Sequence, residues 1–240
     1  MKYSEILHFS HPNHVLKLGH ADAPFKCDGC KEAGIGAVYR CSRACNFDLH
    51  AHCAVPSASI AHPFYTKCSF EFLSRPPGTE ARNCNACERR VTGFSYHCRS
   101  CGFDLHPCCA KLPMAIDGGD LKLYLYGHVT APCHKCGRLG RSWSYRSSCK
   151  KYNLHVACVK EILVDSWREI YGGKGNKRSE GGRIPCLKAT LETHVNHAKM
   201  KGKGEMCCQM AALALQFVVS AVLGDPTTLI AGIVGQLISK

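Results

Sequence analysis

Short apolar clusters, rather than long amphipathic periods, make up the apolar pattern of the chain as far as residue 205. Three of these clusters share one pattern, an aromatic residue two positions before a Leu-His pair, and they begin at Phe47, Phe103 and Tyr152. Each cluster is typical of a short strand with apolar side chains on one face. Because the pattern returns after roughly fifty residues, the sequence predicts tandem modules.

Each predicted module has only a thin apolar core. A unit of this size buries too little apolar surface to fold securely alone, so some further stabilisation is expected. The candidate core residues are Tyr39, Phe47 and Leu49 in the first module, Tyr96, Phe103 and Leu105 in the second, and Tyr145, Tyr152 and Leu154 in the third.

The apolar pattern changes after the third module. Residues 166–205 are glycine-rich and basic, which predicts a mobile linker; from Lys174 to Lys203 there are eight Lys or Arg and two Glu, a net charge of +6. Residues 206–223 carry no charge, and Gly224-Asp225-Pro226 is typical of one helix ending and another beginning. The sequence therefore predicts a C-terminal helical hairpin over 206–240.

The two helical arms are too short to cross a hydrocarbon core of about 30 Å comfortably. We expect residues 174–240 to attach the protein to an anionic membrane surface, because the basic linker precedes an apolar hairpin and Cys207 and Cys208 are candidates for acylation. The alternative is that the hairpin packs on the modules or dimerises.

Composition points to metal binding. The chain holds 19 cysteines and 14 histidines in 240 residues, with a net charge of +13 and a pI near 9.0. The first residues show no signal peptide, so we expect an intracellular protein, in the cytoplasm or nucleus and at the membrane periphery if the hairpin anchors it. In a reducing compartment, cysteine pairs interleaved with histidines indicate Zn²⁺ rather than disulfides.

The spacing of the first module supplies eight candidate ligands, enough for two tetrahedral zinc ions. Interleaved pairs would cross-brace the chain twice. His11 competes with His14 for the leading position of the second site. The first predicted site is Cys27, Cys30, His50 and Cys53, and the second is His14, Cys41, Cys45 and His62.

The second and third modules are progressively less complete. In the second, Tyr65 stands where the first module has His14, so Cys68 is the candidate for the leading ligand. In the third, Ser147 stands where a cysteine is expected, which leaves one firm site. The complete sites are Cys84, Cys87, His106 and Cys109 in the second module, and Cys133, Cys136, His155 and Cys158 in the third; the partial sites are Cys68, Cys98, Cys101 and Asp117 in the second, and Cys149, with His128 as an added candidate, in the third.

A family likeness accompanies these motifs. The stretches HPNHVLKL, CDGC, YRC, CNFDLHAHCA and SIAHP resemble the divergent C1 domain of plant cysteine/histidine-rich proteins, which is related to the zinc domain of protein kinase C. The resemblance covers residues 8–165 in three copies. It implies small β-rich modules, each with a short helix after the last cysteine, and roles in intracellular signalling or stress responses through protein partners.

The predicted organisation is three tandem, cross-braced, zinc-stabilised β-rich modules followed by a linker and an α-helical hairpin. The ranges are 8–62, 63–117 and 118–165 for the modules, 166–205 for the linker and 206–240 for the hairpin. Diacylglycerol binding is not expected, because the stretch between Cys30 and Cys41 lacks the proline and the Gln-Gly element of lipid-binding C1 domains.

We expect no enzymatic activity. A redox dithiol needs an exposed thiol of low pKa in a βαβ context, and no such alternation surrounds Cys27, Cys84 or Cys133. Thioredoxin-like protein-disulfide reduction is one alternative. The other is phosphate-driven binding of nucleic acid, which the basic charge allows although no recognition helix is visible.

Overall fold

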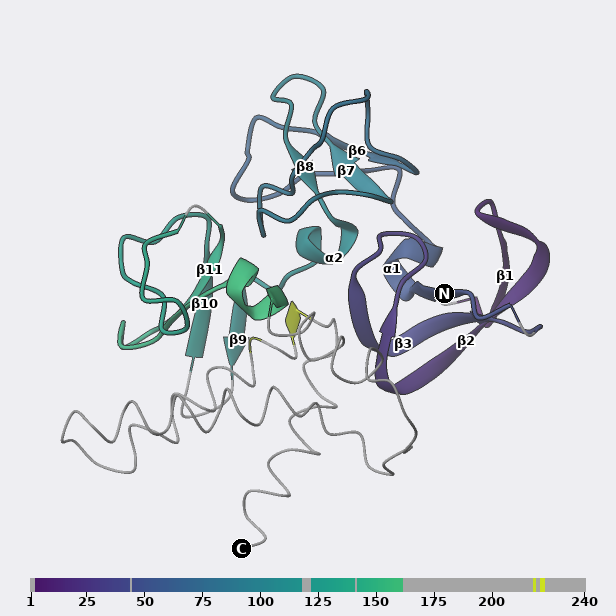
Figure 1. The fold of residues 1–240 in the computed structure, drawn as a ribbon, viewed down its shortest axis with the longest axis horizontal. Helices are drawn as coiled ribbons and strands as arrows, with labels where there is room; N and C mark the ends of the chain where they lie inside the picture. Colours follow the sequence, from purple (N-terminus) through teal and green to yellow (C-terminus); the bar gives the residue numbers. More distant parts are fainter. Residues whose placement is uncertain are drawn as a thin grey trace, which may run out of the picture. The chain divides into compact units, whose positions relative to one another are not determined.

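The computed structural model describes residues 3–43, 45–117, 122–140 and 142–161, together with Val218, Ala221 and Val222. The described residues form two compact units, one ending at Leu112 and the other beginning at Pro113. Among the described residues, the first unit contains two small antiparallel sheets and the second contains one (Figure 1).

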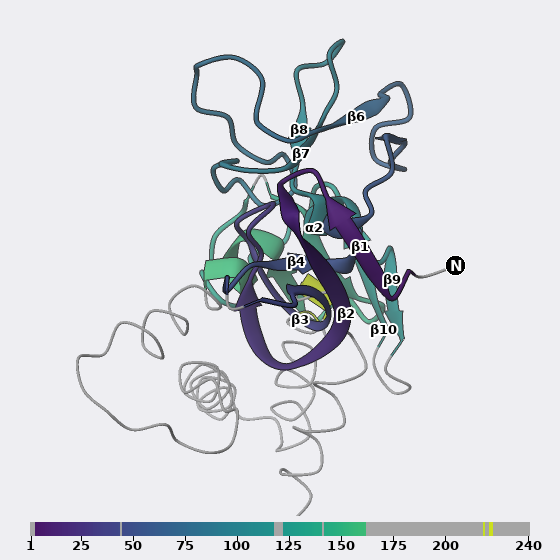
Figure 2. The same cartoon turned by 90° about the vertical axis from the view of Figure 1, so that its right-hand side faces the viewer.

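The first sheet contains β1 (Glu5–His8), β2 (His11–Lys26), β3 (Ala33–Cys41) and β4 (Asp48–His50), paired in chain order. All three pairings are antiparallel. The long strand β2 bends sharply (Figure 2), and its register with β3 shifts between Ala21 and Phe25. Such a shift lets one long strand wrap around a small core.

The second and third sheets repeat this four-stranded antiparallel arrangement, which confirms the prediction of repeated β-rich modules. The second sheet lies in the first unit, and the third sheet lies in the second unit. The second contains β5 (Ser59–Ile60), β6 (Phe70–Leu73), β7 (Ser95–His97) and β8 (Asp104–Leu105); the third contains β9 (Ala115–Asp117), β10 (Lys122–Tyr126), β11 (Ser144–Ser147) and β12 (Asn153–His155).

The central tyrosine of each sheet faces the leucine of the repeated Leu-His pair. Tyr39 pairs with Leu49, Tyr96 with Leu105 and Tyr145 with Leu154. All six side chains are buried. The tyrosine and leucine positions predicted as cores are therefore confirmed in each module.

The second and third sheets begin before the residues at which the sequence placed their boundaries. β5 and β9 precede residues 63 and 118, yet they pair with the strands that follow them. The central tyrosines explain this. The hydroxyl of Tyr96 donates to the carbonyl oxygen of Ser57 at 3.0 Å, and that of Tyr145 donates to the carbonyl oxygen of Pro113 at 2.7 Å, which ties the lead-in segment to its own sheet.

A short helix follows the repeated Leu-His pair in every module. These helices are α1 (Ala51–Ala54), α2 (Pro107–Ala110) and residues 156–161. Each begins directly after the histidine and contains the last cysteine, so it starts earlier than the resemblance implied. Proline at the first position of α2 suits a helix start, since its fixed φ is helical and its missing N–H would have no intrahelical partner.

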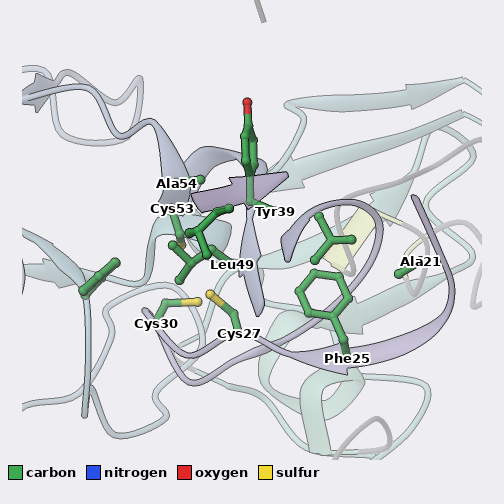
Figure 3. Packing of buried hydrophobic residues seen from close by; sticks show 11 residues of the cluster. Ala21, Phe25, Cys27, Cys30, Tyr39, Leu49, Cys53 and Ala54 are labelled. Carbon is green, nitrogen blue, oxygen red and sulfur yellow. The ribbon is translucent and has the colours of Figure 1, made fainter. Parts of the chain in front are cut away.

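One aromatic side chain joins the first two modules. Phe94 precedes β7, yet it packs in the apolar cluster of the first module. The cluster also contains Cys30, Leu49 and Cys53, which lie close together in Figure 3. Its backbone N–H donates to the carbonyl oxygen of Gly29 at 3.0 Å. A Cβ at Gly29 would lie 2.5 Å from the Phe94 ring, so only glycine allows this approach.

The predicted linker and helical hairpin lie outside the described residues, apart from three positions. Val218, Ala221 and Val222 are helical and buried. Within the described part of the chain, no helix has both the length and the apolar character needed to cross a membrane.

Replacing Phe94 by alanine tests the packing between the first two modules. We expect the free energy of unfolding of the first unit to fall by about 3–5 kcal/mol, because the side chain is buried and its loss leaves a cavity. Urea unfolding followed by circular dichroism measures this loss. Leu139→Ala, at an exposed position, is the control and should change the free energy of unfolding by less than about 0.5 kcal/mol. Equal values for the two variants would contradict the packing role.

Candidate metal centres

Three groups of four side chains share the same composition of three cysteines and one histidine. In each group the ligand atoms all lie within 4.8 Å of one another. The structure thus brings together every residue that the spacing assigned to a complete site of this kind. The groups are Cys27, Cys30, His50 and Cys53; Cys84, Cys87, His106 and Cys109; and Cys133, Cys136, His155 and Cys158.

The histidine of each group presents the same nitrogen to the cysteines. His50 Nδ1 lies 3.3 Å from Cys30 Sγ and 3.8 Å from Cys53 Sγ. The corresponding distances are 3.4 and 3.9 Å for His106, and 3.6 and 3.6 Å for His155. In all three groups Nδ1 is therefore the atom available to a metal ion.

The opposite ring nitrogen of two histidines faces a backbone carbonyl oxygen. His50 Nε2 lies 3.2 Å from the oxygen of Ala33, and His106 Nε2 lies 3.3 Å from the oxygen of Arg90. A carbonyl accepts a hydrogen bond, so Nε2 carries the proton and Nδ1 keeps its lone pair for a metal. Metal-binding histidines are commonly oriented in this way.

The first cysteine of each group is braced from across the module. Its sulfur accepts the backbone N–H of the histidine at 3.4 Å, in the pairs Cys27 with His50, Cys84 with His106 and Cys133 with His155. In all three groups the residue directly after the second cysteine adopts a positive φ. These residues are Lys31, Glu88 and Gly137. This left-handed residue closes the tight turn that lets two sulfurs of one Cys-x2-Cys pair face one ion.

A second brace involves residues that spacing alone does not reveal. The residue after each first cysteine donates its backbone N–H to the strand before the histidine, and its side chain accepts an N–H in return. Asp28 and Asp48 exchange such bonds at 2.8 and 3.0 Å, as do Asn85 and Asp104 at 2.8 and 2.8 Å, and His134 and Asn153 at 2.8 and 3.1 Å. The sequence signal was an acceptor side chain at this position in all three modules.

Burial and mutual hydrogen bonding separate the protonation of the clustered thiols. Burial works to raise the pKa of Cys27, but hydrogen bonds with Cys30, Cys53 and His50 outweigh it and hold that pKa well below its usual value. Burial raises the pKa of Cys53 well above its usual value. In the third module, the hydrogen bond with Cys158 holds the pKa of Cys133 at about 4. The first group thus favours one thiolate, at Cys27, whereas Cys30 and Cys53 need a nearby cation to lose their protons.

A fourth group in the first module has two histidines and two cysteines. It consists of His11, His14, Cys41 and Cys45. His11 Nε2 lies 3.3 Å from Cys41 Sγ, and His14 Nδ1 lies 3.1 Å from Cys45 Sγ. The two histidines, treated as competitors in the sequence, therefore both belong to the group.

His62 does not join this group, so its predicted place beside Cys41 and Cys45 is wrong. Its buried ring packs against Phe64 and Tyr65, and its Nδ1 accepts the N–H of Phe64 at 3.2 Å. His11 takes the position instead because its ring stacks on Phe47, with centroids 4.4 Å apart and an interplanar angle of 11°. This stacking holds His11 over the strand that carries Cys41.

A fifth group in the second module has three cysteines, Cys68, Cys98 and Cys101. Asp117, predicted as its fourth ligand, does not belong to it. Asp117 ends β9 of the third sheet, where its carboxylate lies 2.8 Å from the ammonium of Lys122 on the neighbouring strand.

The strand registers correct the alignment of the first two modules. Leu18 pairs with Tyr39, and Phe72 pairs with the equivalent Tyr96. Four residues before Leu18 is His14, and four residues before Phe72 is Cys68. By the same count Tyr65 stands at the place of His11, not of His14.

The corresponding region of the third module forms no such group among the described residues. Ser147 pairs with Leu123 as Cys41 pairs with Leu16, so a hydroxyl replaces the thiol. Cys149 Sγ lies 3.3 Å from Ser147 Oγ, and neither Cys149 nor His128 belongs to a described metal-ligand group.

Two residues connect the first two modules at their metal centres. Glu32 Oε1, from the first module, lies 3.5 Å from His106 Nε2 of the second. Cys108 of α2 is buried and hydrogen-bonds with Cys30, which adds to the burial that raises the pKa of Cys30 well above its usual value. Each module therefore contributes to the surroundings of the other's site.

Comparison with known proteins agrees with the geometry of the first unit. Residues 9–54 and 62–110 each match the family model described as C1 domain. No match was found among curated proteins or among solved structures. The two C1 matches and the Cys/His groups together support a zinc-binding module.

Alanine substitutions at two histidines test the corrected ligand set. We expect His11→Ala to lower the number of zinc ions bound by one, because it removes one of the four ligands in that group. His62→Ala should leave the number unchanged, because that side chain lies outside it. Native mass spectrometry of the zinc-loaded variants gives both counts. Loss of an ion from His62→Ala alone would restore the original assignment.

Proposed function

We propose that the chain is a non-enzymatic zinc protein whose modules act as interaction surfaces for protein partners. The observation that carries this proposal is that four of the candidate metal centres have a complete set of four protein ligands. Four groups each supply four ligand atoms, which is the complete coordination shell of a structural zinc ion.

The donor set supports zinc over harder divalent ions. Three groups offer three sulfurs and one nitrogen, and the fourth offers two of each. Thiolate and imidazole suit zinc, whereas magnesium and calcium take oxygen ligands. The proposed zinc ligands are the members of these four groups, of which His11 is the one that was not predicted as a ligand from the spacing.

Burial supports a structural rather than a redox role for the Cys-x2-Cys pairs Cys27–Cys30 and Cys84–Cys87 of the first two modules. Cys27, Cys30, Cys84 and Cys87 are all buried. A thiol–disulfide reductase needs an accessible thiolate to attack its substrate, and each of these pairs instead faces its own histidine and third cysteine. A catalytic zinc would also need an open position, which four protein ligands do not leave.

The first sheet offers a surface suited to protein partners. β1 is an edge strand, and edge strands can pair with an added strand from another protein. Leu7 of β1 and the adjoining Phe9 are 69% and 56% exposed, which gives this edge apolar side chains for a partner to cover. Such contacts suit a role in intracellular signalling or stress responses, as the resemblance implies.

The remaining expectations concern the part of the chain outside the described residues. We propose that the basic and apolar stretch 174–240 adds attachment to an anionic membrane surface, because its charge and apolar content are adjacent in sequence. Co-sedimentation of the full chain with anionic vesicles, and not of a chain ending at Gly204, is the expected result. Equal sedimentation of both would contradict it. Binding of diacylglycerol or nucleic acid is not part of the proposed function.

Zinc counting combined with a redox assay separates the proposed function from its enzymatic alternative. We expect the zinc-loaded chain to hold four tightly bound ions by native mass spectrometry and to show no turnover in insulin reduction. Mutation of one cysteine, Cys87→Ser, should remove one ion and leave the insulin assay at background. Fewer than three ions in the wild-type chain, or turnover by the zinc-loaded protein, would overturn the proposal.

A further inference from the structure

The three-cysteine group of the second module differs from the other metal centres in having three ligands. Cys68 Sγ lies 2.9 Å from Cys101 Sγ, and all three sulfurs lie within 4.8 Å of one another. Cys68 and Cys98 are buried, whereas Cys101 is exposed, so the group is open to solvent on one side. Among the described residues, no histidine, aspartate or glutamate completes it.

The place of the missing ligand is aromatic. Counting back from the paired strands puts Tyr65 at the place of His11, and its ring contacts Phe103 as that of His11 contacts the equivalent Phe47. Its ring lies 5.1 Å from that of Phe103 and 5.6 Å from that of Phe70. The imidazole of the first module is thus replaced by a phenol ring packed among other aromatic rings. Such a position suits an ion that needs three ligands better than one that needs four.

Charge also distinguishes the ions that three thiolates can hold. When all three thiols have lost their protons, the complex with zinc has a net charge of −1 and one vacant coordination position. The complex with copper(I) has a net charge of −2. A trivalent ion leaves no net charge, and uncompensated charge is costly beside the buried side chains of Cys68 and Cys98.

We propose that Cys68, Cys98 and Cys101 form a binding site for trivalent arsenic. Arsenic(III) is thiophilic and is satisfied by three sulfurs in a pyramid, with a lone pair in place of a fourth ligand. Arsenous acid, As(OH)₃, reacts with the three thiols so that three As–S bonds form and three As–O bonds break. Each thiol proton leaves with one hydroxide as water, and no oxidant or reductant takes part.

This inference depends on the proposed function in one respect, namely that zinc occupies the four other groups and leaves the three-cysteine group available. The test uses the full zinc-loaded chain, titrated with arsenous acid and followed by native mass spectrometry, which counts zinc and arsenic in the same spectrum. The sequence offers a matched control, because Cys207 and Cys208 are a second set of neighbouring thiols that could trap arsenic. The variants are Cys101→Ser, the double variant Cys207→Ser/Cys208→Ser, and Tyr65→His.

We expect the wild-type chain and the double variant each to bind one arsenic at the three-cysteine group while retaining four zinc ions. Cys101→Ser, at an exposed position, should retain the four zinc ions and lose that arsenic. Tyr65→His should restore a four-ligand group like that of the first module, raising the zinc count to five and lowering arsenic uptake.

Two results would overturn the site. One is a wild-type chain that binds a fifth zinc as tightly as the other four and takes up no arsenic. The other is arsenic uptake that survives Cys101→Ser and disappears in the double variant. Failure of the proposed function would look different, because the wild-type chain would then lack the four zinc ions before any arsenic is added.

Discussion

The convergence of two distant Cys/His pairs on one set of four ligand atoms is the constraint on which the rest of this structure depends. In every module a tight Cys-x2-Cys turn and a His-x2-Cys pair lie about twenty residues apart in sequence, and the structure brings their four ligand atoms together. The apolar cores alone are thin, with one buried tyrosine facing one buried leucine in each sheet. A structural zinc site contributes an apparent binding free energy of about 10–16 kcal/mol, much of it coupled to folding, which is large compared with what such a core supplies.

The modules share this first site and differ in the second. The first module has four ligands there, the second has three sulfurs beside aromatic rings, and in the third a serine replaces the leading cysteine of the pair. The common site therefore maintains the fold, while the second position is free to vary in its chemistry. Contacts between the first two modules, through Phe94 and Glu32, make their two common sites parts of one unit.

Spacing in the sequence predicted the common sites well because their ligands lie in two short motifs of fixed geometry. A Cys-x2-Cys turn and a histidine directly before a one-turn helix leave little freedom in where the ligand atoms point. The second sites were predicted less well, since their leading ligands lie before a strand whose register the sequence does not reveal. Tyr65 was matched to His14, three residues out of register, although Cys68 was correctly chosen as the leading ligand. His11 was treated only as a competitor of His14, because its stacking on Phe47 is a tertiary contact that spacing does not show. Asp117 was assigned by its distance from Cys109, yet β-pairing places it in the next sheet.

The central claim, that metal coordination holds these modules in their folded state, is tested most directly by removing the metal from the intact chain. We predict that a chelator with high affinity for zinc abolishes the β-sheet circular dichroism and the dispersed amide signals of the first unit in an NMR spectrum under reducing conditions, and that added zinc restores both. Retention of the dispersed signals in the metal-free, reduced chain would contradict the account.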